Sequence, residues 1–467
     1  MTKFFKKHKK NVKYYTLSLI FSILTAFISS SILFFNKLIL PGAYTFNPAF
    51  FFTCLSVICI LMTASVVCRQ KPHIARFFHD LFTVFEKGKL TFCSILCGVI
   101  VFFLTFIYVA KMPLDYPIHT DLAGRFDFSR LIPSLIDNSY PLWHVIVKLF
   151  ELIFRIPLNY SAALTSALLV LYTYHISRKI FSENTYGVMS EVFAPILAAA
   201  LMFVQPIYIP WFNKEQIYGQ GSPNILYNPT NLVAKPFAII CVYLIIKLII
   251  KSREEKIKPV EFIRLSIFAL LSVLAKPSAI QVILPTLAVF LLILLIKSRG
   301  KDFLFCVYMT LSWIPALLWM AVVFYLNFVS ESNSGGNGLA LSFFDVWSVY
   351  SPCIPISILL VTLFPIAVLI FFGKKAAIQE KLGTFFGATA VLMGVLEYGL
   401  IMETGDRMLH GNFSWGYSMA LGIFWTFAAD MFFKSTSRKA SGRLWSIAIS
   451  LFVIYVMFGA YYFIATI

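Results

Sequence analysis

The feature that most constrains the fold is a repeated alternation of long apolar runs with short basic segments. Most runs are about 20 residues long, the length that a helix needs to cross the hydrocarbon core of a bilayer. Hydrophobic residues make up 59% of the 467 residues, and charged residues only 13%. A soluble domain has roughly 45–50% apolar and about 25% charged residues, so a soluble core would not hide this much apolar surface. We therefore predict an all-α polytopic membrane protein.

Apolar length and charge placement together predict the topology. We expect about 13 transmembrane helices, joined by polar loops. Their predicted positions are 15–35, 49–67, 90–110, 159–175, 192–209, 232–250, 262–274, 279–296, 303–328, 355–372, 382–401, 415–433 and 445–464. Lysine and arginine cluster in alternate connections, which places those connections and the N-terminus on the cytoplasmic side. The first run lacks a small-residue cleavage site, so we interpret it as a retained span rather than a signal peptide.

The same patterns suggest three parts of the chain. Residues 1–89 would form an N-terminal helix pair with a basic inner loop, and apolar positions near 74–85 in that loop predict an amphipathic surface helix. Residues 90–328 would form the core, with a reactive outer loop at 111–157. Residues 329–467 would add C-terminal spans and outer loops, including a flexible Gly/Ser/Asn loop. We expect a hairpin between 262–274 and 279–296, with Lys276 at its outer turn.

Charge and cysteine content exclude several classes of function. The net charge of +18 comes from basic residues in the connections between apolar runs, not from a patch interleaved with aromatic residues, so we do not expect nucleic-acid binding. The eight cysteines form no C-x-x-C pair, and we interpret them as buried small hydrophobes. The chain contains no P-loop, and so the sequence gives no support for cytosolic ATP chemistry.

The first long outer loop has the highest density of chemically useful residues. Asp115 follows the span at 90–110 closely, with His119 and Asp121 just after it. A carboxylate partly removed from water at the membrane surface gains basicity, which suits general-base work. The D-x-x-x-H-x-D spacing also suits a divalent cation, but it has no third cluster, so we predict no cofactor and no metal. A solvated acidic loop is the alternative interpretation.

The second half of this loop predicts a short helix that is too short to span a bilayer. Its polar residues repeat at steps of four, three and four, which places them on one stripe: His144, Lys148, Glu151 and Arg155. We expect the helix to lie on the outer surface, with Tyr140 and Trp143 at headgroup depth. His144 and Lys148 would then face a lipid-borne phosphate, or the helix would only anchor the loop.

Later outer loops add candidate ligand contacts. Aromatic faces and amides such as Trp211, Asn224 and Tyr227 suit a sugar. Lys235 and Lys276 lie in or between predicted spans, where they would neutralise a phosphate or reach the interface by snorkelling. Arg407 and His410 would meet the same phosphate, or Arg407 would pair with Asp406 and order the loop. Glu397 falls inside a predicted span and needs a partner or a wet cavity.

This layout resembles the GT-C superfamily of integral-membrane glycosyltransferases. The resemblance lies in a span that leads to a long outer loop with an acidic residue, a surface helix, and further spans with polar outer loops. It implies that the donor is a polyprenyl-phosphate-linked sugar and the acceptor a glycan, lipid or protein. It implies that Asp115 is catalytic, with Asp121 as its rival. Contacts to the donor phosphate would come from Lys235, Lys276, Arg407 and His410. The chain departs from the superfamily pattern in having two spans before the supposed first one and no adjacent acidic pair.

The composition indicates where such a protein would reside, and two other functions fit the same features. The chain is rich in lysine and phenylalanine, a composition typical of a bacterial plasma-membrane protein. We expect the site on the outer face of that membrane. A polysaccharide polymerase or ligase would share the lipid-linked substrate and would use a late loop such as 330–351. A transporter or flippase of lipid-linked sugars would rely on an ionisable residue at mid-bilayer, of which Glu397 is the main example.

Overall fold

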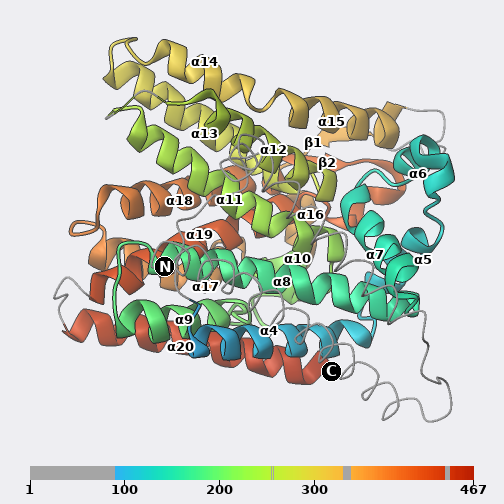
Figure 1. The fold of residues 1–467 in the computed structure, drawn as a ribbon, viewed down its shortest axis with the longest axis horizontal. Coiled ribbons are helices and arrows are strands. Elements are labelled where there is room, and N and C mark those ends of the chain that lie inside the picture. Colours follow the sequence, from blue (N-terminus) through green and yellow to red (C-terminus); the bar gives the residue numbers. More distant parts are fainter. Residues whose placement is uncertain (1–89, 254, 256, 330–337, 437–441, 467) are drawn as a thin grey trace, which may run out of the picture. The chain divides into compact units, whose positions relative to one another are not determined.

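The computed structural model describes residues 90–253, 255, 257–329, 338–436 and 442–466 (Figure 1). The predicted spans at 15–35 and 49–67, the N-terminal part at 1–89 and its amphipathic helix lie outside the described residues. The described residues within 90–151 and 156–466 belong to one compact unit, which carries the candidate site.

The first half of this unit carries the candidate loop between two long helices. Its elements are α4 (Phe92–Ala110), α5 (Tyr116–Gly124), η1 (Phe128–Arg130), α6 (Leu131–Asp137), α7 (Pro141–Phe154), α8 (Leu158–Ser182), η2 (Met189–Phe193), α9 (Ala194–Leu201), α10 (Gln216–Gln220) and α11 (Pro229–Lys251). The predicted short helix after the acidic segment is α7, so its existence is confirmed. It ends before Arg155, which has a left-handed backbone (φ 52°), so the predicted polar stripe stops at Glu151.

The second half consists mainly of long helices in pairs. Its elements are α12 (Pro259–Ala275), α13 (Ser278–Lys297), α14 (Phe303–Leu311), α15 (Ile314–Phe324), η3 (Tyr325–Val329), β1 (Leu339–Leu341), α16 (Asp345–Tyr350), α17 (Ile354–Phe372), α18 (Ile378–Leu400), β2 (Ile401–Glu403), η4 (Gly405–His410), α19 (Ser414–Thr436) and α20 (Gly442–Thr466). The chain breaks at Lys276 and Pro277 between α12 and α13, which confirms the predicted hairpin.

Many of these helices are candidate membrane spans by their length and composition. Six helices in the described part are long and apolar enough to cross a bilayer: α4, α11, α13, α17, α18 and α20. The number rises to seven if α14 and α15–η3, which are bent by 44°, count as one span. The chain is therefore an all-α integral membrane protein. Helices α8, α12 and α19 coincide with three further predicted spans, and the total of about 13 stays a prediction.

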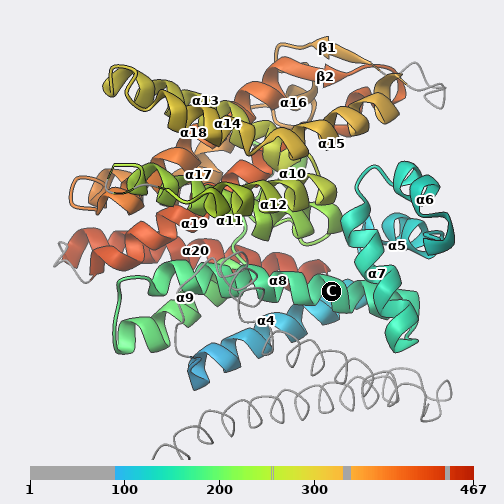
Figure 2. The same ribbon diagram turned by 45° about the horizontal axis from the view of Figure 1, so that its top comes forward.

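The short helices and the two strands gather at one end of the long helices (Figures 1 and 2). Helices α5, α6, α7, α10 and α16 and the two strands lie at this end, next to the turn between α12 and α13. One expectation for this end is wrong. Residues 338–350 are not a flexible loop, because β1 pairs with β2 in an antiparallel sheet and α16 follows. Sequence separation hid this pairing, since the partner strand lies after α18.

Close packing of α18 on α19 fixes the position of residues at the start of α19. A Cβ atom at Gly387 would lie 2.6 Å from the Cα of Phe424, and one at Gly394 would lie 2.6 Å from the Cα of Tyr417. Glycines allow two membrane helices to approach with their backbones nearly in contact. Gly416, at the start of α19, likewise lies against the side chain of Glu397.

Candidate functional site

Asp115 lies where the chain leaves α4 and turns into α5. Met112 (φ 53°) and Leu114 (φ 46°) both adopt left-handed backbone conformations in this turn. Such conformations cost energy for residues with a side chain and are often found at functional sites. The turn places Asp115 directly before α5, half-buried, with its Oδ2 accepting a hydrogen bond of 2.7 Å from Nδ2 of Asn228.

Asn228 is held rigidly because it caps α11. Its Oδ1 accepts hydrogen bonds of 3.0 Å from the backbone N–H of Asn231 and of 3.0 Å from the Thr230 hydroxyl. The N–H groups at a helix start have no partner within the helix, and an asparagine side chain satisfies them well. With Oδ1 engaged at the helix, Nδ2 points away from it and toward Asp115.

Lys276 reaches the other side of the same amide. It ends α12, is only 8% exposed, and its Nζ donates to Asn228 Oδ1 over 3.2 Å. The ammonium also lies 4.4 Å from the ring centroid of Trp415, within the range of a cation–π interaction. The side chain of Asn228 therefore bridges a carboxylate and an ammonium, and we call Asp115, Asn228 and Lys276 the amide-bridged triad. The amide stands between the two charges, which form no direct ion pair with each other in the described part of the chain.

Burial controls the charge of Lys276. It lowers the pKa of Lys276 from 10.5 to about 7, and the negative charge of Asp115 opposes this shift. A buried ammonium is destabilised because it loses its hydration, whereas a nearby anion restores part of that loss. A bound anion would therefore favour the protonated form of Lys276.

Aromatic side chains form a wall beside the triad. Trp415 contacts Tyr218 and Tyr227 edge to face, with centroid separations of 5.6 Å and 6.1 Å. Tyr218 also packs against Tyr350, with centroids 5.3 Å apart. Flat apolar faces with hydroxyl groups at their edges are suited to a sugar ring. The predicted ligand residue Tyr227 therefore joins Asp115 and Lys276 in one place.

Two histidines border this site and are joined by a hydrogen bond. Nδ1 of His119 and Nε2 of His144 are 3.0 Å apart, and Nδ1 of His144 lies 2.9 Å from the carbonyl oxygen of Tyr140. Because that carbonyl only accepts, His144 donates from Nδ1 and accepts from His119 at Nε2. Burial lowers the pKa of His119 to about 3, helped by His144 and Lys276, and the pKa of His144 to about 4. Both imidazoles are therefore neutral at neutral pH.

This histidine pair makes the free energy of unfolding depend on pH. Each folded-state pKa lies below the ordinary value of 6.5, so the unfolded chain binds more protons as the pH falls below that value. The stability conferred by the neutral pair is complete above about pH 6.5 and is lost toward pH 4, at about 1.4 kcal/mol per pH unit for each proton. We expect the unfolding temperature of the purified protein to fall between pH 7 and pH 4.

The matched control for this prediction is a histidine on the surface. His410 is exposed, so His410→Gln should leave the slope of unfolding temperature against pH unchanged. His144→Gln should make the slope shallower, because one of the two buried imidazoles is removed. An identical slope in the His144→Gln variant and the unaltered protein would rule out this origin of the acid sensitivity.

The indole of Trp143 is covered by neighbouring helices. Trp143 is fully buried, and its Nε1 donates to the Ser166 hydroxyl over 3.2 Å. Tyr116 donates to the same hydroxyl over 3.0 Å. This face of α7 therefore packs against α5 and α8, and the expected headgroup depth of Trp143 stays a prediction. A helical stripe in the sequence does not reveal which of its sides is covered by other helices.

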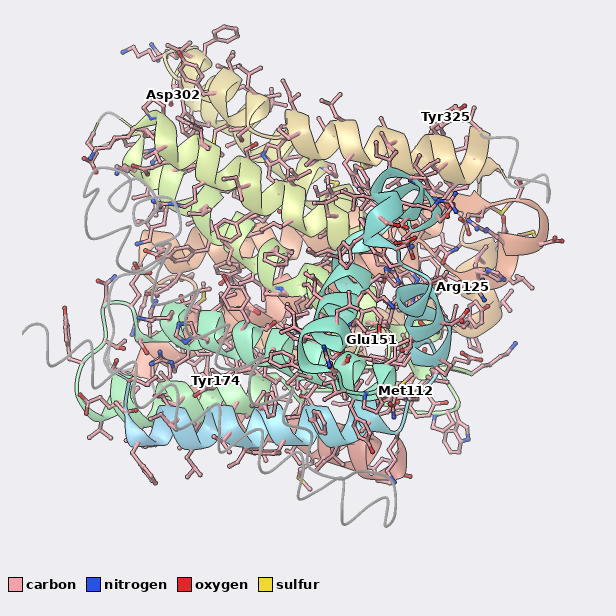
Figure 3. The ribbon with its side chains drawn as sticks, turned by 45° about the vertical axis from the view of Figure 1, so that its right-hand side comes forward. Met112, Arg125, Glu151, Tyr174, Asp302 and Tyr325 are labelled. Atoms are coloured by element: carbon pink, nitrogen blue, oxygen red, sulfur yellow. The ribbon has the colours of Figure 1, made fainter. Side chains whose placement is uncertain are left out.

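Four other charged residues of the loop form two ion pairs. Asp121 forms an exposed ion pair with Arg125 over 2.5 Å. Lys148 pairs with Glu151 over 2.8 Å and donates to the carbonyl of Gly124 over 3.1 Å. Figure 3 shows Arg125 and Glu151 at the same end of the helices as Met112, and Asp302 at the opposite end. The structure thus separates the two predicted acidic candidates, with Asp115 in the triad and Asp121 at the surface.

Three further predicted residues are not joined to the triad by the contacts of the described residues. Arg407 lies in η4 and pairs at 4.0 Å with Glu403, which also accepts a hydrogen bond of 2.5 Å from Asn412. His410 is exposed, and Trp211 is 88% exposed. Burial raises the pKa of Tyr140, and the positive charge of Arg407 opposes this shift. Arg407 therefore borders the start of α7.

Lys235, in α11, and Asn224, in the segment before that helix, contact each other and not the triad. Nζ of Lys235 donates to the Asn224 side-chain oxygen and, over 2.7 Å, to the carbonyl of Pro223. Glu397 faces Gly416 on α19, and its Oε2 is buried without a hydrogen-bond partner among the described residues. The predicted need of Glu397 for a partner is thus unmet within the described part of the chain.

Two members of the site were not singled out as ligand contacts from sequence. Asn228 stands in N-P-T-N, and an asparagine before proline is a signal for a helix start, but it gives no hint of the contact with Asp115. Trp415 lies among polar residues, and only the packing of α18 on α19 brings it to Lys276.

No group of three or more metal-ligating side chains is present among the described residues. The predicted D-x-x-x-H-x-D set diverges, because His119 turns to His144 and Asp121 turns to Arg125. Comparisons with protein-family models, with curated proteins and with solved structures found no match. The function proposed for the chain therefore rests on its own geometry.

Proposed function

We propose that this protein is a membrane glycosyltransferase that moves a sugar from a polyprenyl-phosphate donor to an acceptor hydroxyl. The observation that carries the proposal is the amide-bridged triad, which holds a carboxylate and a buried ammonium close together at one end of a membrane helix bundle. Transfer from a sugar phosphate needs both groups, one for the proton of the nucleophile and one for the charge of the leaving group.

The reaction assigns one task to each charge. The acceptor oxygen attacks the anomeric carbon, while the bond between that carbon and the phosphate oxygen breaks. Asp115 takes the proton of the acceptor hydroxyl. Polyprenyl phosphate leaves with one more negative charge than it had as a diester, and Lys276 stabilises this charge. The hydrogen bond from Asn228 orients the carboxylate of Asp115.

The aromatic wall supplies a place for the sugar. Trp415, Tyr218 and Tyr227 offer ring faces and hydroxyl groups next to Lys276. Aromatic faces cover the apolar side of a sugar ring, and hydroxyl groups satisfy its polar edge. The lipid chain of the donor would remain in the bilayer, which this apolar protein shares. The acceptor, a glycan, lipid or protein, supplies the attacking hydroxyl.

A second candidate function is transport of a lipid-linked sugar without chemistry. It is favoured by Glu397, because a buried carboxyl oxygen without a partner inside a candidate span, as seen among the described residues, is typical of ion or proton pathways. A polymerase or ligase would share the donor but would extend a polymer. The three functions have different outcomes with the same labelled substrate: transfer of one sugar, growth of a polymer, or movement of the intact donor.

The test supplies one labelled sugar in two activated forms to the full chain in liposomes. With the polyprenyl-phosphate form, we expect label to appear in a single-addition product. With the nucleotide form, we expect no product, because the lipid anchors the donor beside the triad. Product from the nucleotide form alone would refute the proposal. Growth of a polymer, or movement of intact donor across the bilayer, would assign one of the two alternatives.

A further inference from the structure

A small cavity lies inside the helix bundle, separate from the triad. Its volume is about 30 Å³, and it is lined by α8, α11, α19 and the segment that precedes α11. Its polar lining comes from Thr173, Ser222, Asn224, Asn231, Lys235 and Ser418. One water molecule needs roughly 10–15 Å³ on this measure, so the cavity has room for one or two water-sized species.

The cavity contains a lysine whose hydrogen-bond partners are neutral. Lys235 donates to two oxygens, the Asn224 amide and the Pro223 carbonyl, and neither carries a charge. Among the described residues, no aspartate or glutamate forms an ion pair with it. An ammonium inside a membrane span is costly unless an opposite charge accompanies it.

Two other polar groups of the lining have no partner among the described residues. Asn231 is 4% exposed and Ser418 is 2% exposed. Nδ2 of Asn231 and Oγ of Ser418 are both buried without a hydrogen bond within that part of the chain. Buried polar atoms are almost always satisfied, so unpaired ones beside a cavity indicate that something occupies it.

The donors of the lining favour an anion over water. The amide Nδ2 of Asn231 can only donate, because its Oδ1 already accepts from the Ser278 hydroxyl over 3.1 Å. Lys235 also only donates, and the Ser418 hydroxyl is able to donate. A water molecule would leave the lysine charge uncompensated, whereas an anion would satisfy all three donors and the charge. The volume is too small for a phosphoryl group on a lipid and fits a monatomic ion.

We propose that this cavity binds one halide ion, held by the ammonium of Lys235, the amide of Asn231 and the hydroxyl of Ser418. The ion neutralises a charge between α8, α11 and α19 and so contributes to their packing. Asn231 links the cavity to the triad, since its backbone N–H donates to Asn228 Oδ1. The proposal does not depend on the glycosyltransferase assignment.

The test measures binding of radioactive chloride to the purified full chain in a gluconate buffer. We expect saturable binding at close to one ion per chain. Lys235→Met should weaken it roughly tenfold or more, because a charge-assisted hydrogen bond is lost. Inorganic phosphate should not compete, because it is too large for the cavity. An absence of saturable binding, or unchanged binding by Lys235→Met, would show that the cavity holds water only.

A second variant reduces the cavity without removing any donor. A Cβ atom at Gly422 would lie 3.1 Å from the Pro223 carbonyl oxygen and 3.2 Å from Cε of Lys235. Gly422→Ala should therefore weaken chloride binding several-fold while the protein remains folded, and it decides the question if Lys235→Met does not fold. Lys276→Met should bind chloride normally, which separates this site from the triad. Normal binding by Gly422→Ala would contradict the assigned location.

Discussion

Replacing Asp115 by asparagine is expected to lower the rate of sugar transfer roughly 100- to 10,000-fold, the range for loss of a general base. Asparagine has the same size, and its Oδ1 can still accept the hydrogen bond that Asn228 donates to Asp115. The change therefore removes the proton acceptor and little else. Initial rates with a polyprenyl-phosphate sugar measure the effect, and the unfolding temperature shows that the variant is intact.

Asp121→Asn is the matched control, because Asp121 belongs to the same loop and undergoes the same chemical change. Its carboxylate is 59% exposed and pairs with Arg125, an interaction worth little at a surface. We expect its transfer rate to stay within about twofold of the unaltered protein, as for an exposed ion pair. Equal losses in the two variants would mean that the loop's charge matters and that Asp115 has no special role.

Replacing Lys276 by methionine is expected to lower kcat/KM for the lipid donor roughly 100- to 1,000-fold, as for loss of one group that stabilises transition-state charge. Methionine is also unbranched and of similar length, and it removes the ammonium that lies over the ring of Trp415. The fold should be as stable or more stable, because a buried charge that lacks a direct ionic partner among the described residues is costly. Lys214→Met is the control, since Lys214 is an exposed lysine shortly before α10.

The lowered pKa of Lys276 predicts that kcat/KM for the lipid donor depends on pH. Burial lowers the pKa of Lys276 to about 7, so the free protein loses the ammonium as the pH rises above that value. Donor binding requires the charged form, and kcat/KM should fall by at most about tenfold per pH unit on the alkaline side. The decline should be absent from the residual activity of Lys276→Met. An unchanged alkaline limb in that variant would assign the decline to another group.

The sequence predicted the helical membrane class because apolar length and charge are local signals. It also predicted the hairpin at Lys276, since proline follows directly and basic residues flank both helices. It also singled out Asp115 as the candidate catalytic carboxylate, because Asp115 lies close to the end of a span. What it could not provide was the partner of each residue. Asn228 lies far along the chain from Asp115, and only the start of α11 beside α5 brings the two together.

Local spacing did contain one clue that separates the two acidic candidates. Asp121 and Arg125 are four residues apart, a spacing at which helical side chains meet, so their ion pair follows from the sequence alone. The environments of Lys235 and Lys276 do not follow in this way. Both lysines looked alike as charges in or between spans, yet one enters the triad and the other lines the small cavity.

The central claim is that the triad breaks the bond between a sugar and a polyprenyl phosphate. The most direct measurement is the ratio of polyprenyl phosphate released to sugar transferred, determined with the full chain in liposomes. We predict one released for each sugar transferred with the unaltered protein, and a rate of release lowered roughly 100- to 10,000-fold with Asp115→Asn. Recovery of intact donor, or equal release by both proteins, would contradict this claim.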